Sequence, residues 1–449
     1  MKANFLACFM LKPFSSLRTR GFLVATSLVV FLVFTSSSPA ATLSGLQSGT
    51  LVMSPGAGSS QTSPVTIAPI DPTKSILFFN YHGNSTDPDD GLVRGRILNG
   101  TTLEFTRGSD SGTDGVLTDL TIYWQVASFS AGVSVQRGTF TSVSTTGDVT
   151  ISPVDLTRSF VLVSGSVASP DTTYSGDDFF RARLTSTTNL EIIHSTSSSR
   201  TADWQVVEFT NSSVQRGIGT LGSTDVFATA TISSVNLSKS IALISWKTSG
   251  IGGAQNMVRA RLDNATQIRV DREVTGTVID FAWEVIEFSD ATTVQSGETT
   301  LNSVESSLAV PIVCTNTSSA VSLLAPAGGN WGGTHSFTAR DQIGPGMFTA
   351  IITGANTLTL TRASTDSVTG TASWFVVDFS PLQCCSAADC NDGTVCTNDI
   401  CSDGFCLHSN NTLPCDDGLF CTASDVCGGG ICAGSGDPCT GGQLCNETA

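Results

Sequence analysis

Three pairs of arginine residues, each with one residue between its members, could bind an acidic or hydroxylated ligand. The pairs are Arg94/Arg96, Arg181/Arg183 and Arg259/Arg261. Alternate side chains of a β-strand lie on one face, so two guanidinium groups could together hold a carboxylate, a sulfate or sugar hydroxyls. The alternative is an ion pair across the sheet with Glu208 or Glu287, near the end of a later strand. The sequence leaves both interpretations open, and we predict a ligand face at these arginines.

Trp331 is a further candidate for ligand contact, because it lies in the glycine-rich segment 328–333. An exposed aromatic ring among glycines can stack on the face of a sugar. The ring could equally cover the end of an array of repeats, since terminal repeats often differ from internal ones.

The sequence predicts no catalytic, cofactor-binding or metal-binding site, and we expect no enzymatic activity. Of the four histidines, only His194 occupies a recurring position, where other copies have Arg. There is no metal-spaced His pair, nucleophile elbow or phosphate-binding loop. The acidic segments 87–90 and 177–178 offer oxygen ligands of the kind that Ca²⁺ prefers, but they lack the spacing of a defined calcium loop. We therefore expect solvated loops there.

A strand that begins with Trp and ends with Phe occurs four times. Its tryptophans are Trp124, Trp204, Trp283 and Trp374, at intervals of 80, 79 and 91 residues. Such a period indicates one folding unit copied in tandem. In the second copy, Trp204 and Val206 point to one face and Val207 and Phe209 to the other. A strand that is apolar on both faces is central in its sheet, and we predict that the four Trp side chains anchor the core.

Two further segments recur in every copy. A Gln-x-Gly phrase opens each copy, and a 15-residue segment alternates apolar and polar residues around a short turn, at 93–107, 180–194, 258–272 and 348–362. This alternation is typical of a β-hairpin. We predict an all-β chain with four tandem antiparallel β-sandwich repeats at residues 41–130, 131–210, 211–289 and 290–382. Because the last strand of one copy leads straight into the next, we expect a semi-rigid rod.

The order of these segments resembles that of the H-type lectin domain, which has an opening Gln-x-Gly, a hairpin and a final strand with Trp. Segments 46–49 and 124–129, with their counterparts in the other copies, carry the resemblance. It implies binding of sugars related to N-acetylgalactosamine, generally by a trimer. No sugar-contacting residue of that family aligns here, so the resemblance places no site.

The amino terminus predicts export. Lys2, Lys12, Arg18 and Arg20 precede an apolar run at 22–34, and small residues at 38–40 suit cleavage after Ala40. Thirteen apolar residues are short for a membrane anchor, and the mature chain has no longer run. Removal of residues 1–40 changes the net charge from −16 to −20. A chain this acidic is repelled by nucleic acid and anionic lipid.

Composition changes at Cys384, because twelve of the fourteen cysteines lie in the last 66 residues. We predict a small disulfide-rich repeat region at 383–449, in keeping with export. Its disulfide-forming residues include Cys390, Cys396, Cys401, Cys406, Cys415, Cys421, Cys427 and Cys432. Cys314 could pair with Cys384 or Cys385. Zinc binding is the alternative, but there is no Cys-x-x-Cys.

The spacing of segments 396–401 and 415–427 resembles the CTDC-type cysteine repeats of extracellular proteins. The resemblance implies a spacer or interaction module. The third cysteine unit has two of four cysteines and the mature count is odd, so we expect a longer chain beyond residue 449.

These features predict a secreted or cell-surface protein that binds without catalysis, with a glycan or surface protein as partner and carbohydrate as the favoured ligand class. One alternative is a stalk that spaces another domain from the surface. Another is the non-catalytic part of an extracellular enzyme.

Overall fold

A computed structural model describes the chain from residue 40 to 436 with short gaps. The described residues are 40–54, 61–108, 119–142, 145–167, 171, 173–196, 200–325, 333–335, 343–402, 404–419 and 421–436. The predicted export signal and Trp331 lie outside them. Within the described residues, no helix has the length and hydrophobicity needed to cross a membrane.

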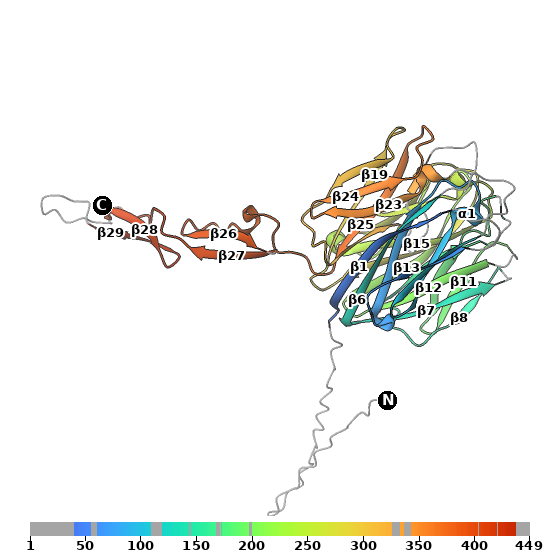
Figure 1. The fold of residues 1–449 in the computed structure, drawn as a ribbon, viewed down its shortest axis with the longest axis horizontal. Helices are drawn as coiled ribbons and strands as arrows, with labels where there is room; N and C mark the ends of the chain where they lie inside the picture. Colours follow the sequence, from blue (N-terminus) through green and yellow to red (C-terminus); the bar gives the residue numbers. More distant parts are fainter. Residues whose placement is uncertain are drawn as a thin grey trace, which may run out of the picture. The chain divides into compact units, whose positions relative to one another are not determined.

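Each of the four repeats consists of two small antiparallel sheets, which confirms the predicted all-β architecture (Figure 1). The first repeat contains β1 (Thr42–Met53), β6 (Leu120–Ala131) and β3 (Ser75–His82) in one sheet, and β2 (Gln61–Thr66), β5 (Thr102–Arg107) and β4 (Val93–Asn99) in the other. The second contains β7 (Val133–Ser142), β12 (Arg200–Phe209) and β9 (Ser159–Ser166), with β10 (Arg181–Ser186), β11 (Asn189–Ile193) and β8 (Asp148–Thr150).

The third and fourth repeats keep this order of strands. The third contains β13 (Ser212–Leu221), β18 (Ile279–Phe288) and β15 (Ser240–Thr248), with β14 (Phe227–Thr231), β17 (Gln267–Asp271) and β16 (Arg259–Asn264). The fourth contains β19 (Thr293–Leu301), β25 (Gly370–Asp378), β21 (Ala320–Leu324) and β22 (Gly333–His335), with β20 (Ser307–Pro311), β24 (Thr357–Arg362) and β23 (Phe348–Gly354). In each repeat the Trp strand is central in its sheet, as its apolar faces predict.

Among the described residues, helical structure is confined to single turns. These are α1 (Pro88–Gly91), α2 (Gly253–Asn256), η1 (Pro72–Lys74), η2 (Leu237–Lys239), η3 (Gly344–Gly346) and η4 (Ala387–Cys390). They are too short to form layers of their own, so the strands provide nearly all of the buried surface.

The Gln-x-Gly phrase has a structural explanation in each repeat. In the second repeat, the Gln136 side chain accepts a hydrogen bond from Ser152 N at 2.7 Å and donates one to Ser152 O at 2.9 Å, which ties the two sheets together. Gly138 lies beneath the Trp204 ring, where an added Cβ atom would come within 2.7 Å of Cζ2. Only glycine permits this approach, so the Gln and Gly positions are fixed by packing.

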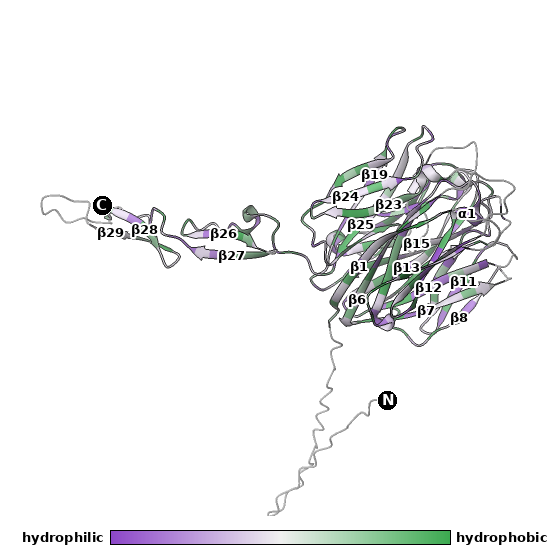
Figure 2. Cartoon of the chain, viewed as in Figure 1, coloured by the Kyte–Doolittle hydropathy of each residue, from purple (hydrophilic) through white to green (hydrophobic). Residues whose placement is uncertain are grey.

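In the second and fourth repeats, the two faces of the Trp strand pack in different hydrophobic clusters. In the second repeat, Trp204 and Val206 pack with Phe180 and Leu190 in a core private to that repeat. Val207 and Phe209 point the opposite way and join a core that residues of all four repeats share. Figure 2 shows the alternation of hydrophobic and hydrophilic residues along the strands. Each strand thus stabilises its own sandwich and the assembly of repeats.

In three of the repeats, the residue after Trp forms hydrogen bonds to a neighbouring repeat. The side chain of Gln205 accepts a hydrogen bond from Leu77 N at 3.0 Å and donates one to Leu77 O at 2.8 Å, joining the second repeat to the first. Glu284 accepts from Val161 N at 2.7 Å, joining the third to the second. Gln125 accepts from Ser322 N at 2.9 Å, joining the first to the fourth.

The contact between the first and fourth repeats closes the array, so the expectation of a rod was wrong. A backbone hydrogen bond from Ala260 N to Ala325 O, at 3.3 Å, completes the remaining junction between the third and fourth repeats. The physical reason is the second apolar face of each Trp strand. That face would be exposed in a rod, whereas closure buries it in the shared core.

Four equivalent phenylalanines meet in the shared core. They end the Trp strands of the four repeats and are Phe129, Phe209, Phe288 and Phe379. Successive ring centroids are 5.4, 5.2, 6.1 and 5.2 Å apart around the cycle. These separations are typical of favourable aromatic pairs, so each repeat contributes one ring to a common centre.

The carboxy-terminal region contains two hairpins held by disulfides. They are β26 (Thr397–Ser402) with β27 (Phe405–Asn410), and β28 (Ser424–Gly428) with β29 (Ile431–Ser435). The disulfides are Cys314–Cys385, Cys384–Cys401, Cys390–Cys406, Cys396–Cys427 and Cys415–Cys432. Cys421 is also disulfide-bonded.

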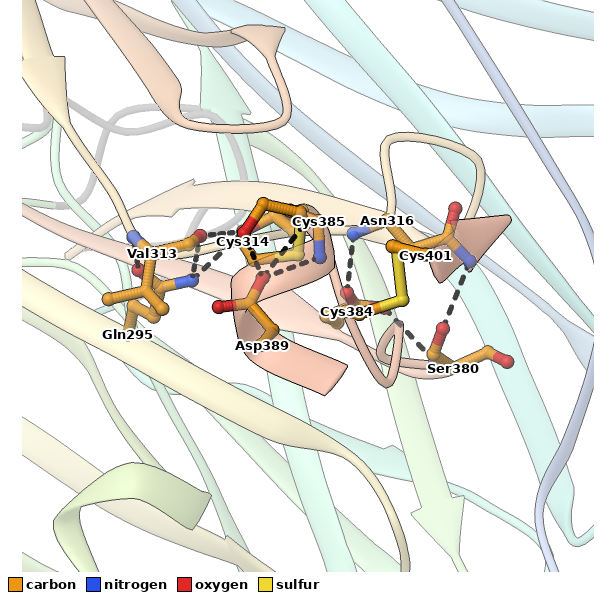
Figure 3. Close-up of a disulfide and its surroundings, with 12 residues drawn as sticks. Gln295, Val313, Cys314, Asn316, Ser380, Cys384, Cys385, Asp389 and Cys401 are labelled. Carbon is orange, nitrogen blue, oxygen red and sulfur yellow. Dashed lines mark hydrogen bonds between the residues drawn. A yellow bond between two sulfur atoms is a disulfide. The ribbon is translucent and has the colours of Figure 1, made fainter. Parts of the chain in front are cut away.

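The Cys314–Cys385 disulfide attaches this region to the fourth repeat (Figure 3). Beside it, Asn316 Nδ2 donates to Ser380 O at 3.0 Å, which fixes the end of the fourth repeat. Since these cysteines are oxidised, zinc binding at them is not needed to explain the cysteine spacing.

Candidate recognition cleft between the first and second repeats

The arginines of the predicted ligand face lie on the hairpins and form ion pairs. Arg96 pairs with Glu104 at 2.6 Å, and Arg183 pairs with Glu191 at 2.7 Å, both across their own hairpin. Arg181 also contacts Glu191, at 3.3 Å. Glu104 and Glu191, on the second strand of each hairpin, thus neutralise most of the positive charge of these arginines.

Other members of the pairs connect neighbouring repeats. Arg94 of the first repeat pairs with Asp203 of the second at 2.8 Å. Arg259 of the third repeat pairs with Glu298 of the fourth at 3.0 Å, and Arg261 pairs with Asp271 at 2.6 Å. The arginine pairs therefore contribute to the junctions between repeats.

The suggested pairing with Glu208 and Glu287 was wrong. Glu208 accepts a hydrogen bond from Asp155 N at 3.1 Å, and Glu287 accepts one from Asn236 N at 2.8 Å. Both carboxylates therefore bind the turn that precedes a strand of their own repeat. Both glutamates lie on the Trp strand, and the hairpin that bears the arginines belongs to the other sheet of the sandwich.

The four tryptophans predicted to anchor the core are buried. Trp124, Trp204, Trp283 and Trp374 are 7 or 8% exposed. One indole N–H, that of Trp374, donates to Thr299 Oγ1 at 2.9 Å. Trp204 has a role beyond packing, because its ring also lines a cleft.

The acidic segments expected to be solvated loops are mostly buried. Asp89 and Asp90 belong to α1 and are 2 and 3% exposed, and Asp178 is 3% exposed. The cause is packing between neighbouring repeats. An added Cβ at Gly91, beside these residues, would collide with the Tyr174 hydroxyl of the next repeat.

A cleft of about 150 Å³ lies between the hairpin of the first repeat and the Trp strand of the second. Its walls come from three strands: β4 contributes Arg96, β7 contributes Arg137 and Thr139, and β12 contributes Trp204 and Gln205. Arg96 Nη1 donates to Thr139 Oγ1 at 3.0 Å across the mouth. The lining combines an aromatic ring, an amide, a hydroxyl and two guanidinium groups, which are the kinds of side chain found in sites for sugars and carboxylates.

Arg137 differs from its counterpart in the third repeat, Arg216. Arg216 donates from Nε to Glu284 Oε1 at 3.3 Å and from Nη1 to Leu156 O at 2.6 Å, and its Nη2 binds Ser159 O. Arg137 keeps the equivalent contact, with Nη2 donating to Ser75 O at 2.6 Å. Its Nε and Nη1 have no hydrogen-bond partner among the described residues.

The difference comes from one residue. The position after Trp is Glu284 in the third repeat and Gln205 in the second, so Arg137 lacks the carboxylate that neutralises Arg216. Burial lowers the pKa of Arg137 to about 10, so the guanidinium remains charged at neutral pH. Neighbouring atoms cover Nε and Nη1. An anionic group in the cleft would interact with the positive charge of Arg137 at short range, or the guanidinium would move into the cleft to contact it.

The sequence contained the signal for this site, although reasoning from motifs missed it. Alignment of the repeats places Ser48, Arg137, Arg216 and Ser296 at one position. The residue after Trp is Gln, Gln, Glu and Phe in the same order. Only the second repeat combines a cation with a neutral partner.

Comparisons with known proteins give little further information. No family model matches the chain, and no solved structure matches it. Part of the chain is similar to protein psiQ of Dictyostelium discoideum, with 37% identity over 83 residues. The match covers 16% of this chain and 8% of that protein.

Proposed function

We propose that the chain is an exported, non-catalytic recognition protein that binds a glycan in the cleft between its first two repeats. The charge of Arg137 carries the proposal, because no carboxylate of the described residues forms an ion pair with it and Asp71 acts on it only from a longer distance. A buried charge without a partner costs free energy, which a ligand that supplies a carboxylate would recover. Glycans with a uronic or another acidic sugar are therefore the favoured ligands.

The net charge of the protein does not exclude such a ligand. Long-range repulsion from an acidic chain is screened over about 8 Å at physiological ionic strength. Arg96 and Arg137 are the charged residues that line the cleft, Glu104 pairs with Arg96 and Asp203 accepts from Thr139 beside it, and Trp204 contributes an aromatic side chain to the lining.

The carboxy-terminal region suits an extracellular setting. Its disulfides are of the kind that forms in oxidising compartments. The resemblance to CTDC-type repeats supports a role as a spacer or interaction module. The resemblance of the repeats to H-type lectin domains supports carbohydrate as the ligand class.

A glycan array that includes acidic sugars and their neutral parents tests the proposal on the full exported chain. Arg137→Ser is the decisive variant, because Ser occupies this position in the first and fourth repeats, at Ser48 and Ser296. Arg183→Ser is the matched control, since it removes an ion-paired arginine of the hairpin.

We expect saturable binding to acidic glycans that falls at least tenfold in Arg137→Ser and persists in Arg183→Ser. Absence of binding across the array would refute the glycan proposal and favour a stalk. Binding lost in Arg183→Ser but kept in Arg137→Ser would place the ligand on the hairpin face.

A further inference from the structure

Three carboxylates cluster in the second repeat, outside the residues that line the cleft. One oxygen from each of Asp171, Asp177 and Asp178 lies within 4.8 Å of the others. Asp177 and Asp178 are 7 and 3% exposed, so solvent does little to screen the repulsion between their charges.

The third repeat shows how the same position is satisfied without charge. Asn256 corresponds to Asp178, because each residue lies three positions before the first arginine of its hairpin. The side chain of Asn256 accepts from Thr248 Oγ1 at 2.9 Å and donates to Gly250 O at 3.4 Å. Asp178 Oδ2 accepts from Ser175 N at 2.5 Å, but the buried Oδ1 has no partner among the described residues.

A second buried side chain without a partner lies near the cluster. His194 occupies the position of Arg272 in the third repeat, as the registers of the two hairpins show. Arg272 donates to the loop carbonyls of Asp225 and Thr277, at 2.7 and 2.6 Å. His194 is 1% exposed, and neither ring nitrogen has a hydrogen-bond partner within the described part of the chain.

The cluster is therefore short of positive charge. Arg200 contacts Asp171 at 2.6 Å and also binds Asp177. Three ionised carboxylates and one guanidinium leave a net charge of −2, which one divalent cation would neutralise.

We propose that Asp171, Asp177 and Asp178 bind one Ca²⁺ ion, with Arg200 holding two of the carboxylates in place. All three ligands are hard oxygens, which Ca²⁺ accepts in flexible geometry, whereas Mg²⁺ requires a compact octahedron. The site would connect the loop at 171 to the turn at 175–178. Asp89 of the first repeat accepts a hydrogen bond from Asp171 N at 3.1 Å, so the ion would also stabilise the junction between the two repeats.

Calcium titration of the full exported chain, freed of metal with EDTA, tests this site by calorimetry and by thermal unfolding. Asp178→Asn introduces the residue that the third repeat uses. His194→Arg introduces the residue of the other three repeats, and its charge would replace that of the ion. Asp148→Asn, at an exposed position of the same repeat, is the matched control.

We expect one site per chain, with a dissociation constant on the order of 0.1 to 1 mM or tighter, as in extracellular modules. Mg²⁺ should bind at least tenfold more weakly. Both Asp178→Asn and His194→Arg should weaken Ca²⁺ binding at least tenfold, while Asp148→Asn should bind as the unmodified chain does. If Asp178→Asn fails to fold, His194→Arg decides the question. The proposal would be overturned if Ca²⁺ produced neither heat nor a shift in Tm. It would also be overturned if a folded Asp178→Asn or His194→Arg variant bound Ca²⁺ as tightly as the unmodified chain.

Discussion

Replacing Gln205 with Glu should weaken the binding of acidic ligands by neutralising Arg137 from inside the protein. The third repeat shows the resulting arrangement, in which Glu284 accepts from a neighbouring backbone amide at 2.7 Å and approaches Arg216 Nε to 3.3 Å. Gln205 already accepts from the equivalent amide, that of Leu77, at 3.0 Å. The new carboxylate would therefore lie beside Arg137 without rearrangement of the backbone.

The magnitude follows from the contacts that change. A hydrogen bond to a charged group contributes about 1.5–3 kcal/mol, and affinity changes tenfold for each 1.4 kcal/mol. Loss of the ligand's contact with Arg137 should therefore weaken binding by about 10- to 100-fold. Stability should change by no more than about 1 kcal/mol, because the bond from Gln205 Nε2 to Leu77 O is lost while an ion pair is gained.

The assay is a titration of an acidic glycan against the unmodified chain and against Gln205→Glu. Ser134→Glu adds the same charge at an exposed position of β7 and serves as the control. A folded Gln205→Glu protein that binds the acidic glycan with unchanged affinity would refute the role of Arg137.

Three further predictions concern stability. Arg216→Ser leaves Glu284 buried without its cation, so the free energy of unfolding in urea should fall by about 3 kcal/mol; a loss below 1 kcal/mol would contradict the pairing. Burial lowers the pKa of His82 to about 4, so the unfolded chain binds the extra proton between pH 6.5 and 4. The free energy of unfolding should therefore fall by about 3 kcal/mol as the pH drops through this range. Comparison with His82→Asn isolates the effect. Parallel curves of unfolding free energy against pH for the two proteins would contradict it. Cys314→Ser/Cys385→Ser removes a disulfide with a sequence separation of 71. The double variant should lose about 2–4 kcal/mol in denaturant titrations, and an unchanged midpoint would show that the bond adds nothing.

Much of the fold could be predicted from the sequence because each repeat is a local unit. The alternation around residues 180–194 depends on side chains that pair across one hairpin, and the structure has that hairpin as β10 and β11. The Trp strand was correctly placed at the centre of its sheet, since Trp204 and Phe209 lie on opposite faces of an apolar strand. Both patterns reflect contacts within a repeat.

The features that the sequence analysis missed all depend on contacts between repeats. Phe209 was assigned to the core, but its neighbours Phe129 and Phe288 belong to other copies. The acidic segments are buried where neighbouring repeats pack against each other. Arg137 is the middle residue of the Gln-x-Gly motif, which was interpreted only as the start of a repeat. That Arg137 lacks a carboxylate partner is visible only by comparison with Arg216, which has Glu284. Alignment of the copies position by position would have shown this difference, whereas a search for motifs could not.

Closure of the four repeats is the central claim, because the core that all four repeats share depends on it. A double-mutant cycle between Phe129 of the first repeat and Phe379 at the end of the fourth, measured by urea unfolding with Leu substitutions, tests it most directly. Their ring centroids are 5.2 Å apart, so the coupling free energy should be about 0.5–1.5 kcal/mol. A cycle between Phe129 and the exposed Phe405 is the control and should show additive effects. Additivity within about 0.3 kcal/mol for Phe129 and Phe379 would instead place the two repeats apart and contradict closure.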